Sequence, residues 1–262
     1  MSQTIDRALD VLDCFREGGA FSLSELGARS GLSVSTVHRI VAVLERRGVL
    51  IRDPRSQQYM VGPDLVAIAA RADTVAQITA LARPLLAELR DGCGETSVLS
   101  LLVGDRRVAV EQCESSHQLR RSVDLGRPLE LHFGSAGKAM LAHLPDAERE
   151  RLLRGLPPLG HTPFTHTDPQ ALRAELEGIR RRGFAVSKNE YLIGVTSLGA
   201  AVFNRDGAVV AALSVTGPLS RLTPNLYGKV GAATAAMAQK LTHALAGPGA
   251  ADSTATAAVR SA

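Results

Sequence analysis

Two short helical segments joined by a turn that contains glycine are the feature that most limits how this chain can fold. The first segment begins at Ser22, which forms a capping-box pattern with Glu25, and it ends at Gly31. The second begins at Ser33 and ends at Gly48. Its apolar residues recur at helical spacing and predict one buried face: Val34, Val37, Ile40, Val41 and Leu44. Helices this short and this close together predict a helix-turn-helix.

Elements on either side of the pair complete a small N-terminal domain. A helix-patterned segment precedes the pair and ends at Gly18-Gly19. After the pair, the β-prone residues 49–52 and 57–61 flank a four-residue turn, which predicts a hairpin that serves as a wing. We therefore expect a winged helix-turn-helix domain over residues 1–62 and a linker helix over residues 63–80.

Positive charge is concentrated in this N-terminal part of the chain. The whole sequence has a formal net charge of +4, whereas the stretch from Ser33 to Gln58 alone contains five arginines and two acids. In a helix-turn-helix the second helix enters the major groove, and a wing contacts backbone phosphates. The predicted DNA interface consists of Ser33, Ser35, Thr36, His38, Arg39, Arg46, Arg52 and Arg55. The alternative is an ordinary surface helix that carries serine, threonine and arginine.

The rest of the chain mixes strand and helix patterns. Strands are expected at residues 96–103 and 107–111, and a late hairpin is expected around a turn at residues 204–207. Helical patterns occupy residues 136–144, 147–153, 169–182 and 226–245. This mixture predicts an α+β domain over residues 81–246. Residues 247–262 are small and polar, so we expect a disordered tail.

A helix start and a hairpin in this second domain predict a ligand site. Gly134-Ser135-Ala136 is expected to begin a helix, whose free backbone amides favour an anion, although a tight packing turn explains these residues equally well. The expected hairpin register pairs Phe203 with Ala208, Ser197 with Ser214, and Val195 with Thr216, and it places the last four side chains on one face. These groups either satisfy one another or line a small pocket. Glu190 either binds a ligand hydroxyl or is a solvated loop acid.

Enzyme motifs fail on inspection. The segment around Lys138 lacks the residues of a P-loop, because His132 and Ala139 stand where glycine and a hydroxyl residue are needed. Phe133 stands where a nucleophile elbow needs glycine. A hydrolase or transferase that uses His132, Ser135 and Lys138 remains the enzyme alternative, and we expect the protein not to be an enzyme.

Metal and cofactor sites also find no support in residue spacing. His161, His166 and Asp168 match no common metal-site spacing, and Asp168 before Pro169 has the simpler role of a helix cap. The three cysteines form no C-x-x-C pair. We therefore expect no metal and no cofactor.

The composition of the sequence bears on the cellular compartment and on which kind of nucleic acid the protein binds. No apolar run reaches the roughly 18 residues that a membrane helix needs, and the first residues lack the pattern of a secretory signal. Aromatic residues make up 3% of the sequence, which argues against stacking on single-stranded nucleic acid. We expect a cytoplasmic protein with no membrane partner.

An ordered series of motifs resembles the IclR family of bacterial transcriptional regulators. The N-terminal part of the resemblance lies in residues 6–12, in Ser35-Thr36-Val37-His38-Arg39 and in residues 44–50. It continues through residues 81–86, 134–139 and 212–221, so that it covers about residues 3 to 245. The resemblance implies a DNA-binding regulator whose second domain is a GAF-like domain that binds a small effector, often an organic acid or a small aromatic compound.

The resemblance also implies particular site residues and partners. Family pocket positions correspond here to Leu129, Ser135, Ala136, Ser187, Val195, Ser197, Ser214 and Thr216. Some members carry an acid in place of Ser187 and a cysteine in place of Ser197, which leaves the effector unidentified. The implied assembly is a homo-oligomer, a dimer through the DNA-binding region or a dimer of dimers, on a pseudo-palindromic double-stranded operator. A DNA-binding regulator without an effector, whose pocket is a packed core, is the other alternative.

Overall fold

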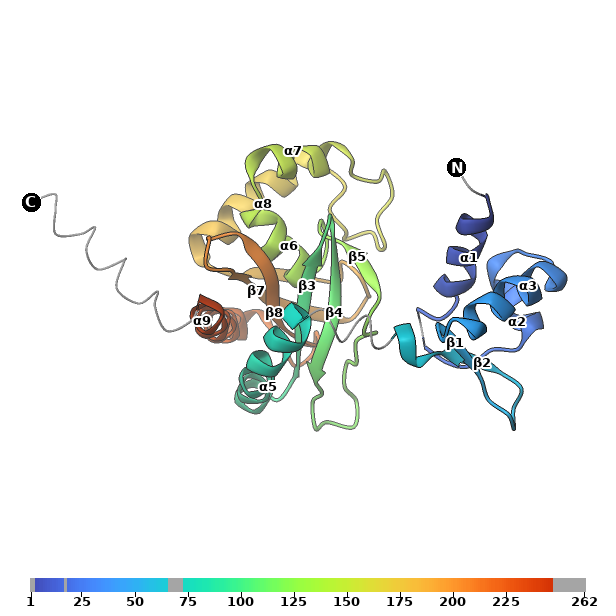
Figure 1. Ribbon diagram of the computed structural model, residues 1–262. Coiled ribbons are helices and arrows are strands. Elements are labelled where there is room, and N and C mark those ends of the chain that lie inside the picture. Colours follow the sequence, from blue (N-terminus) through green and yellow to red (C-terminus); the bar gives the residue numbers. More distant parts are fainter. Residues whose placement is uncertain (1–2, 17, 66–72, 247–262) are drawn as a thin grey trace, which may run out of the picture. The chain divides into compact units, whose positions relative to one another are not determined.

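The computed structural model describes residues 3–16, 18–65 and 73–246, and within them the chain forms two compact units (Figure 1). The division falls between Gln77 and Ile78. The predicted fold class is confirmed, because a helical unit with a small hairpin is followed by a mixed unit of helices and one sheet. The middle of the expected linker helix, residues 66–72, and the expected tail, residues 247–262, lie outside the described residues. No helix among the described residues has the length and apolarity to cross a membrane.

Up to Val61, the described residues of the first unit form three helices and a two-stranded sheet. Its elements are α1 (Gln3–Asp13), α2 (Leu23–Ser30), α3 (Val34–Arg46), β1 (Leu50–Arg52) and β2 (Tyr59–Val61). The Ser22 hydroxyl accepts a hydrogen bond from the Glu25 amide while the Glu25 carboxylate accepts one from the Ser22 amide, so the predicted capping box forms. Gly31 ends α2 in a left-handed conformation that suits glycine.

One apolar core holds this unit together. Side chains from all three helices and from both strands are buried in it, including Val11, Leu26, Val37, Leu50 and Tyr59. Burying a side chain of this size stabilises a fold by about 1.5–3 kcal/mol. The core therefore orients α3 and the hairpin on a common support.

The second unit is a six-stranded antiparallel sheet with helices on both faces. Its strands lie in the order β5-β4-β3-β8-β7-β6. They are β3 (Thr96–Val103), β4 (Arg106–Cys113), β5 (Pro128–Glu130), β6 (Ala185–Lys188), β7 (Val195–Phe203) and β8 (Val209–Pro218). The helices are α5 (Asp73–Cys93), α6 (Ser135–His143), α7 (Asp146–Arg154), α8 (Pro169–Arg182) and α9 (Tyr227–Ala246), with the short 3-10 helix η1 (Pro224–Leu226) before α9.

Two cores lie on opposite faces of this sheet. The helices α5 and α9 cover one face, where Leu86, Leu198 and Leu241 share a core. The helices α6, α7 and α8 lie on the other side, where Met140, Leu172 and Ala212 share a second core (Figure 1). Helix α5 runs without a break across residue 80, where the sequence pattern places the end of the linker.

The register of the late hairpin differs from the expectation. Ser197 pairs with Thr216, Gly199 with Ser214 and Val195 with Pro218, so the strands are shifted by two residues. The predicted pairs were wrong because Phe203 pairs with Val209 rather than Ala208, and because a bulge at Val202/Phe203 adds a further residue. A shift of two residues preserves the face of each side chain, so the hydroxyl groups still project together.

Candidate nucleic-acid interface and ligand cavity

Most of the predicted DNA-contacting side chains lie on the surface of the first unit. Ser35, His38, Arg39 and Arg46 are exposed along α3, and Arg52 and Arg55 are exposed on the hairpin. Among the residues that the structure describes, none of these arginines forms an ion pair with an acid. Their guanidinium groups therefore remain available for phosphate oxygens or base edges.

The hydroxyl groups at the start of α3 form a small cluster. Ser33 caps the helix, and its oxygen lies 3.1 Å from the Ser35 hydroxyl and 2.9 Å from the Thr36 hydroxyl. Thr36 is half-buried and borders a groove between α1 and α3, so it differs from the exposed Ser35. The structure thus brings Ser33 and Ser35 to the exposed start of the helix and turns Thr36 toward α1.

The turn of the hairpin is held by Asp53. Its carboxylate accepts hydrogen bonds from the backbone amides of Arg55, at 2.6 Å, and Ser56, at 3.2 Å, and these bonds lower the pKa of Asp53. The Arg52 guanidinium lies 5.5 Å from the centre of the Tyr59 ring, whose buried side chain belongs to the core. The two wing arginines are therefore presented on a defined turn.

A small cavity lies in the second unit, between the sheet and the start of α6. Its volume is about 70 Å³. All nine residues proposed from the sequence for effector binding line it: Leu129, Ser135, Ala136, Ser187, Glu190, Val195, Ser197, Ser214 and Thr216. The strand register brings three of the hydroxyl groups side by side, because Ser187 of β6 pairs with Ser197 of β7, which in turn pairs with Thr216 of β8.

Eight further residues line the same cavity, and of these only Gly134, at the expected helix start, stands out in the sequence. They are Val98, Ser100, Arg107, Arg121, Val123, Gly134, Tyr191 and Leu192. Arg107 belongs to the doublet Arg106-Arg107, which suggests an exposed strand end, and strand alternation alone turns one of the two inward. Tyr191 and Leu192 stand in a loop without periodic pattern, so no sequence signal identifies them.

Glycine allows the close approach of α6 to the sheet. A Cβ atom on Gly199 would lie 2.8 Å from the Ser135 carbonyl carbon and 2.9 Å from the Ala136 nitrogen. Backbone atoms cannot give way as the end of a long side chain can. The contact therefore fixes the helix start against β7 and sets one wall of the cavity.

The amides at the start of α6 are not all free, contrary to the expectation from the sequence. The Gly134 amide donates to Glu190 Oε2 at 2.9 Å, and the Ser135 amide donates to the Ser197 hydroxyl at 3.4 Å. Glu190 is buried, so its interpretation as a solvated loop acid was wrong. The loop that carries it is closed by Asn189, which adopts a left-handed conformation and accepts a hydrogen bond from the Gly194 amide.

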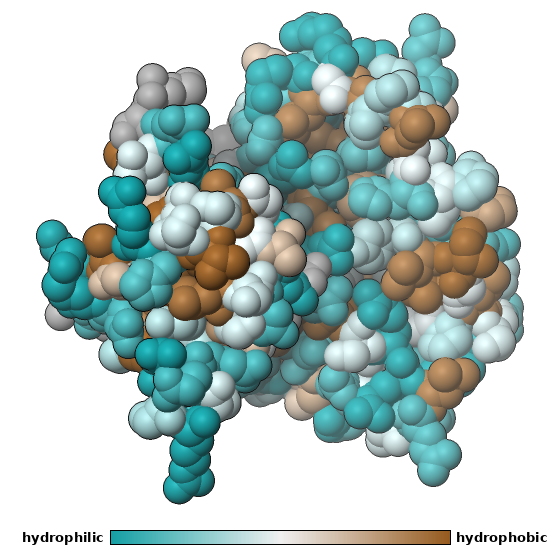
Figure 2. Space-filling view, turned by 90° about the vertical axis from the view of Figure 1, so that its right-hand side faces the viewer, coloured by the Kyte–Doolittle hydropathy of each residue, from teal (hydrophilic) through white to brown (hydrophobic). Residues whose placement is uncertain are grey.

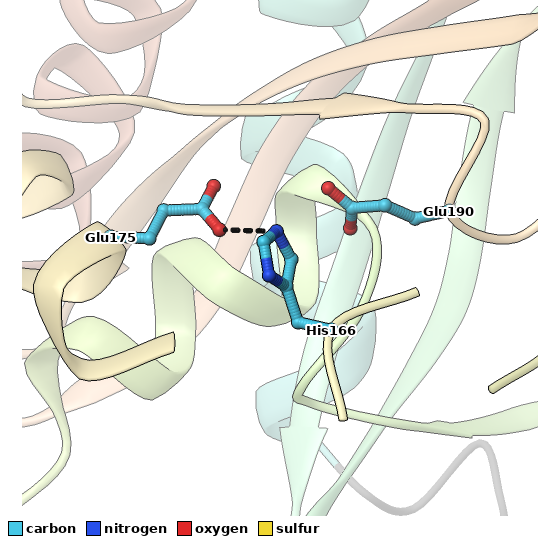
Figure 3. A group of neighbouring side chains, drawn as sticks. All are labelled: His166, Glu175 and Glu190. Atoms are coloured by element: carbon cyan, nitrogen blue, oxygen red, sulfur yellow. Dashed lines mark ion pairs between the residues drawn. The ribbon is translucent and has the colours of Figure 1, made fainter. Parts of the chain in front are cut away.

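A partly buried ionic network adjoins the cavity, with Lys138 and Glu190 buried and His166 and Glu175 half-buried, and three of its members are drawn in Figure 3. The Lys138 ammonium group lies 2.5 Å from Glu190 Oε1 and 2.6 Å from Glu175 Oε1, and it also donates to the Val186 carbonyl. The His166 ring lies 2.9 Å from the other oxygen of Glu175. Three of these residues, His166, Glu175 and Glu190, bring atoms of the kind that ligate metals within 4.8 Å of one another. Here Lys138 supplies the positive charge between the two carboxylates.

The neighbouring charges in this network shift the pKa values of Glu175 and His166. Burial raises the pKa of Glu175, but the hydrogen bond from His166 and the charge of Lys138 outweigh it and lower this pKa to about 2. The bond to Glu175 raises the pKa of His166 although burial opposes the shift. The network is therefore a set of compensated charges.

Two polar groups at the cavity lack partners among the described residues. The Ser135 hydroxyl is buried without a hydrogen bond, and so is the Nε of Arg107. Because Ser135 contacts no base and Lys138 is bound by two carboxylates, the residues of the enzyme alternative form no nucleophile–base pair. Unsatisfied buried groups of this kind are suited to binding a polar ligand.

Comparisons with known proteins agree over both units. The model of the IclR helix-turn-helix domain matches residues 4–54, and that of the bacterial transcriptional regulator IclR C-terminal domain matches residues 71–243. The HTH-type transcriptional regulator BhcR of Paracoccus denitrificans is 33% identical over 93% of this chain and 88% of its own.

Two solved structures are similar along nearly the whole chain. An IclR transcriptional regulator from Silicibacter has a TM-score of 0.77 and 32% identity, over 93% of this chain and 96% of its own. An IclR homolog from Microbacterium hydrocarbonoxydans complexed with 4-hydroxybenzoate has a TM-score of 0.78 and 26% identity, over 93% of this chain and 99% of its own.

Proposed function

The chain belongs to the IclR family of bacterial transcriptional regulators, and we propose that its cavity holds a small organic acid that controls how α3 and the hairpin bind operator DNA. The protein is a DNA-binding regulator of the ligand-responsive type. The observation that carries the proposal is the cavity, because nine residues from six separate parts of the second unit converge there. A solved relative that binds 4-hydroxybenzoate supports a carboxylate ligand.

The DNA-binding part of the proposal rests on exposed arginines that form no ion pair with any residue the structure describes. Arg39 is exposed on α3, and we assign it to base reading, whereas Arg52 is exposed on the hairpin, and we assign it to phosphate contact. Replacing Arg39 by alanine should reduce the preference for the operator over random DNA. Replacing Arg52 by alanine should weaken binding to every sequence alike and reduce the salt dependence.

A duplex selected by the protein from a random pool serves as the operator in this test. Fluorescence anisotropy would measure the affinities of both variants for that duplex and for scrambled DNA at several salt concentrations. Equal losses on both duplexes for the Arg39 variant would contradict base readout by this residue.

A second copy of the chain is the other partner that we propose, in addition to DNA. Apolar side chains are exposed on α1, at Ile5 and Leu9, and on α3, at Val43. Figure 2 shows apolar side chains at the surface among hydrophilic ones on the face turned to the viewer. Contiguous exposed apolar patches mark interaction surfaces, and a dimer that binds two half-sites needs such a surface on each copy. Replacing Leu9 by glutamate should shift the sedimentation coefficient toward a smaller species, and an unchanged coefficient would contradict pairing through α1.

The effector part of the proposal states that a ligand in the cavity controls operator binding. Replacing Ser214 by leucine would fill part of a cavity of about 70 Å³ and should abolish the response to ligand while operator binding persists. A packed core without a ligand predicts a different result, namely lower stability and no ligand response in the wild type either. Thermal-shift screening of the full chain against small carboxylates and phenolic acids would find the ligand, because binding stabilises the folded state.

A further inference from the structure

Arg107 is a buried cation that forms no ion pair within the described part of the chain. It lies on β4 opposite Leu129 of β5, and it is 9% exposed. Among the residues that the structure describes, its side chain forms no ion pair and donates no hydrogen bond, and its Nε is buried without a partner. A buried charge in this condition is costly, because it has lost water without gaining an ion pair or a hydrogen bond from the described residues.

Two neighbouring cations, unlike Arg107, have their charge balanced by carboxylates within the described part of the chain. Arg106, the preceding residue, is exposed and pairs with Glu130. Lys138 is completely buried and is held between Glu175 and Glu190. Glu190 is the acid that lines the cavity with Arg107, but its two oxygens already bind the Lys138 ammonium group and the Gly134 amide. The charge of Arg107 is therefore available to a ligand.

Small residues make room for the guanidinium group beside the start of α6. A Cβ on Gly134 would lie 2.8 Å from one terminal nitrogen of Arg107, and a Cβ on Gly137 would lie 3.1 Å from its Nε. The guanidinium carbon lies 5.5 Å from the centre of the buried Phe133 ring, which supports a cation. Burial lowers the pKa of Arg107 to about 10, which still leaves it charged near neutral pH. The side chain is thus held in place and charged.

We propose that Arg107 binds the carboxylate of the effector and makes a negative charge on the ligand a requirement for binding. This inference rests on the proposed function of the cavity and names the group that selects the ligand. The Ser135 hydroxyl forms no hydrogen bond with the described residues and belongs to the cavity lining, so it would be the second donor for the same carboxylate. Two of the amides at the start of α6 are occupied by protein groups, so the charge selection comes from the guanidinium group.

Matched pairs of ligands test the requirement for charge. The full chain would be titrated with acetate, lactate, benzoate and 4-hydroxybenzoate, and with the primary amide of each acid, while its melting temperature is recorded. We expect at least one acid to raise the melting temperature and its neutral amide to have no effect. Replacing Arg107 by methionine should weaken binding of that acid by about 10- to 100-fold, the loss typical of a hydrogen bond to a charged group.

The variant Arg106→Met is the matched control, because it removes an exposed arginine from the same strand. It should bind the acid as the wild type does. In ligand-free buffer Arg107→Met should melt at the same temperature as the wild type or higher, since it removes an uncompensated buried charge. A melting temperature several degrees lower would show that Arg107 is a structural residue and would overturn the proposal.

The remaining outcomes separate this inference from the proposed function. If an acid and its amide stabilise the protein equally, the cavity is an effector site but Arg107 does not select charge, and the inference fails alone. If Arg107→Met binds the acid as tightly as the wild type, the inference also fails alone. If no acid and no amide stabilises the wild type, both the inference and the proposed function are contradicted.

Discussion

At the scale of single residues, the second unit depends on how its buried charges are compensated. Lys138 is completely buried and contacts two carboxylates and a backbone carbonyl, so every direction of its ammonium group is occupied. Removing one partner from such a network leaves the others as uncompensated charges in a medium of low dielectric constant. The network is therefore a point at which one substitution affects the whole unit.

Replacing Lys138 by methionine should lower the free energy of unfolding by about 3–5 kcal/mol, because Glu175 and Glu190 would then lose the cation that they share. Urea unfolding of the full chain followed by circular dichroism would measure the change. Lys240→Met is the control, since Lys240 forms an exposed pair with Glu88 that should contribute at most about 1 kcal/mol. Equal losses in the two variants would contradict this account.

The contact between His166 and Glu175 predicts a dependence of stability on pH. The pKa of His166 is raised in the folded state, so its contribution to stability is complete below the ordinary histidine pKa of about 6.5 and is lost as the pH rises through the raised value. The wild type should therefore exceed His166→Gln in unfolding free energy by more at about pH 6 than at about pH 9. Urea midpoints at both pH values would show it, and a constant difference would argue against the pair.

Residue-scale features were only partly predictable from the sequence. The hydroxyl residues of the hairpin could be placed on one face because alternation along a strand survives a register shift of two. The burial of Glu190 could not, because it depends on Lys138, which is distant in sequence, and on a turn closed by Asn189. Arg107 was hidden for the same reason, since Arg106 beside it is exposed and both look like surface residues.

At the scale of elements, the close packing of the start of α6 against the sheet shapes the cavity. Replacing Gly199 by alanine would push Cβ into the backbone of Ser135 and Ala136, so we expect a loss of about 1–3 kcal/mol in unfolding free energy and weaker ligand binding. Gly178→Ala is the control within α8, where the nearest atoms are the ends of arginine side chains, and it should stabilise by up to about 1 kcal/mol. Chemical unfolding and ligand titration of both variants would test the prediction, and a Gly199 variant as stable as the wild type would contradict it.

The elements with strong patterns were predictable, and the short edge strands were not. Capping residues and apolar stripes locate α2, α3 and α8, where Asp168 accepts hydrogen bonds from the amides of residues 170 and 171 as a helix cap. Strands β5 and β6 have three and four residues, too few to show a period. The hairpin register failed at a bulge, which local turn residues do not reveal.

At the scale of the whole molecule, regulation requires that ligand and DNA binding be linked. Helix α5 begins at Asp73 and packs Ile78, Ala82 and Leu86 into the core of the second unit. The sheet forms one wall of the cavity. We propose that α5 transmits the structural change caused by ligand binding from this sheet to the preceding segment of the chain. A ligand alters operator affinity only by the difference in its affinity for the two arrangements of the protein, typically about 1–3 kcal/mol.

Operator affinity with and without ligand is the measurement that tests this linkage most directly. A duplex selected from a random pool would be titrated with the full chain, in the presence and absence of a carboxylate that raises its melting temperature. We predict a change of about 5- to 150-fold in the wild type and no change in Ser214→Leu. A carboxylate that binds the wild type and leaves its operator affinity unchanged would contradict the account.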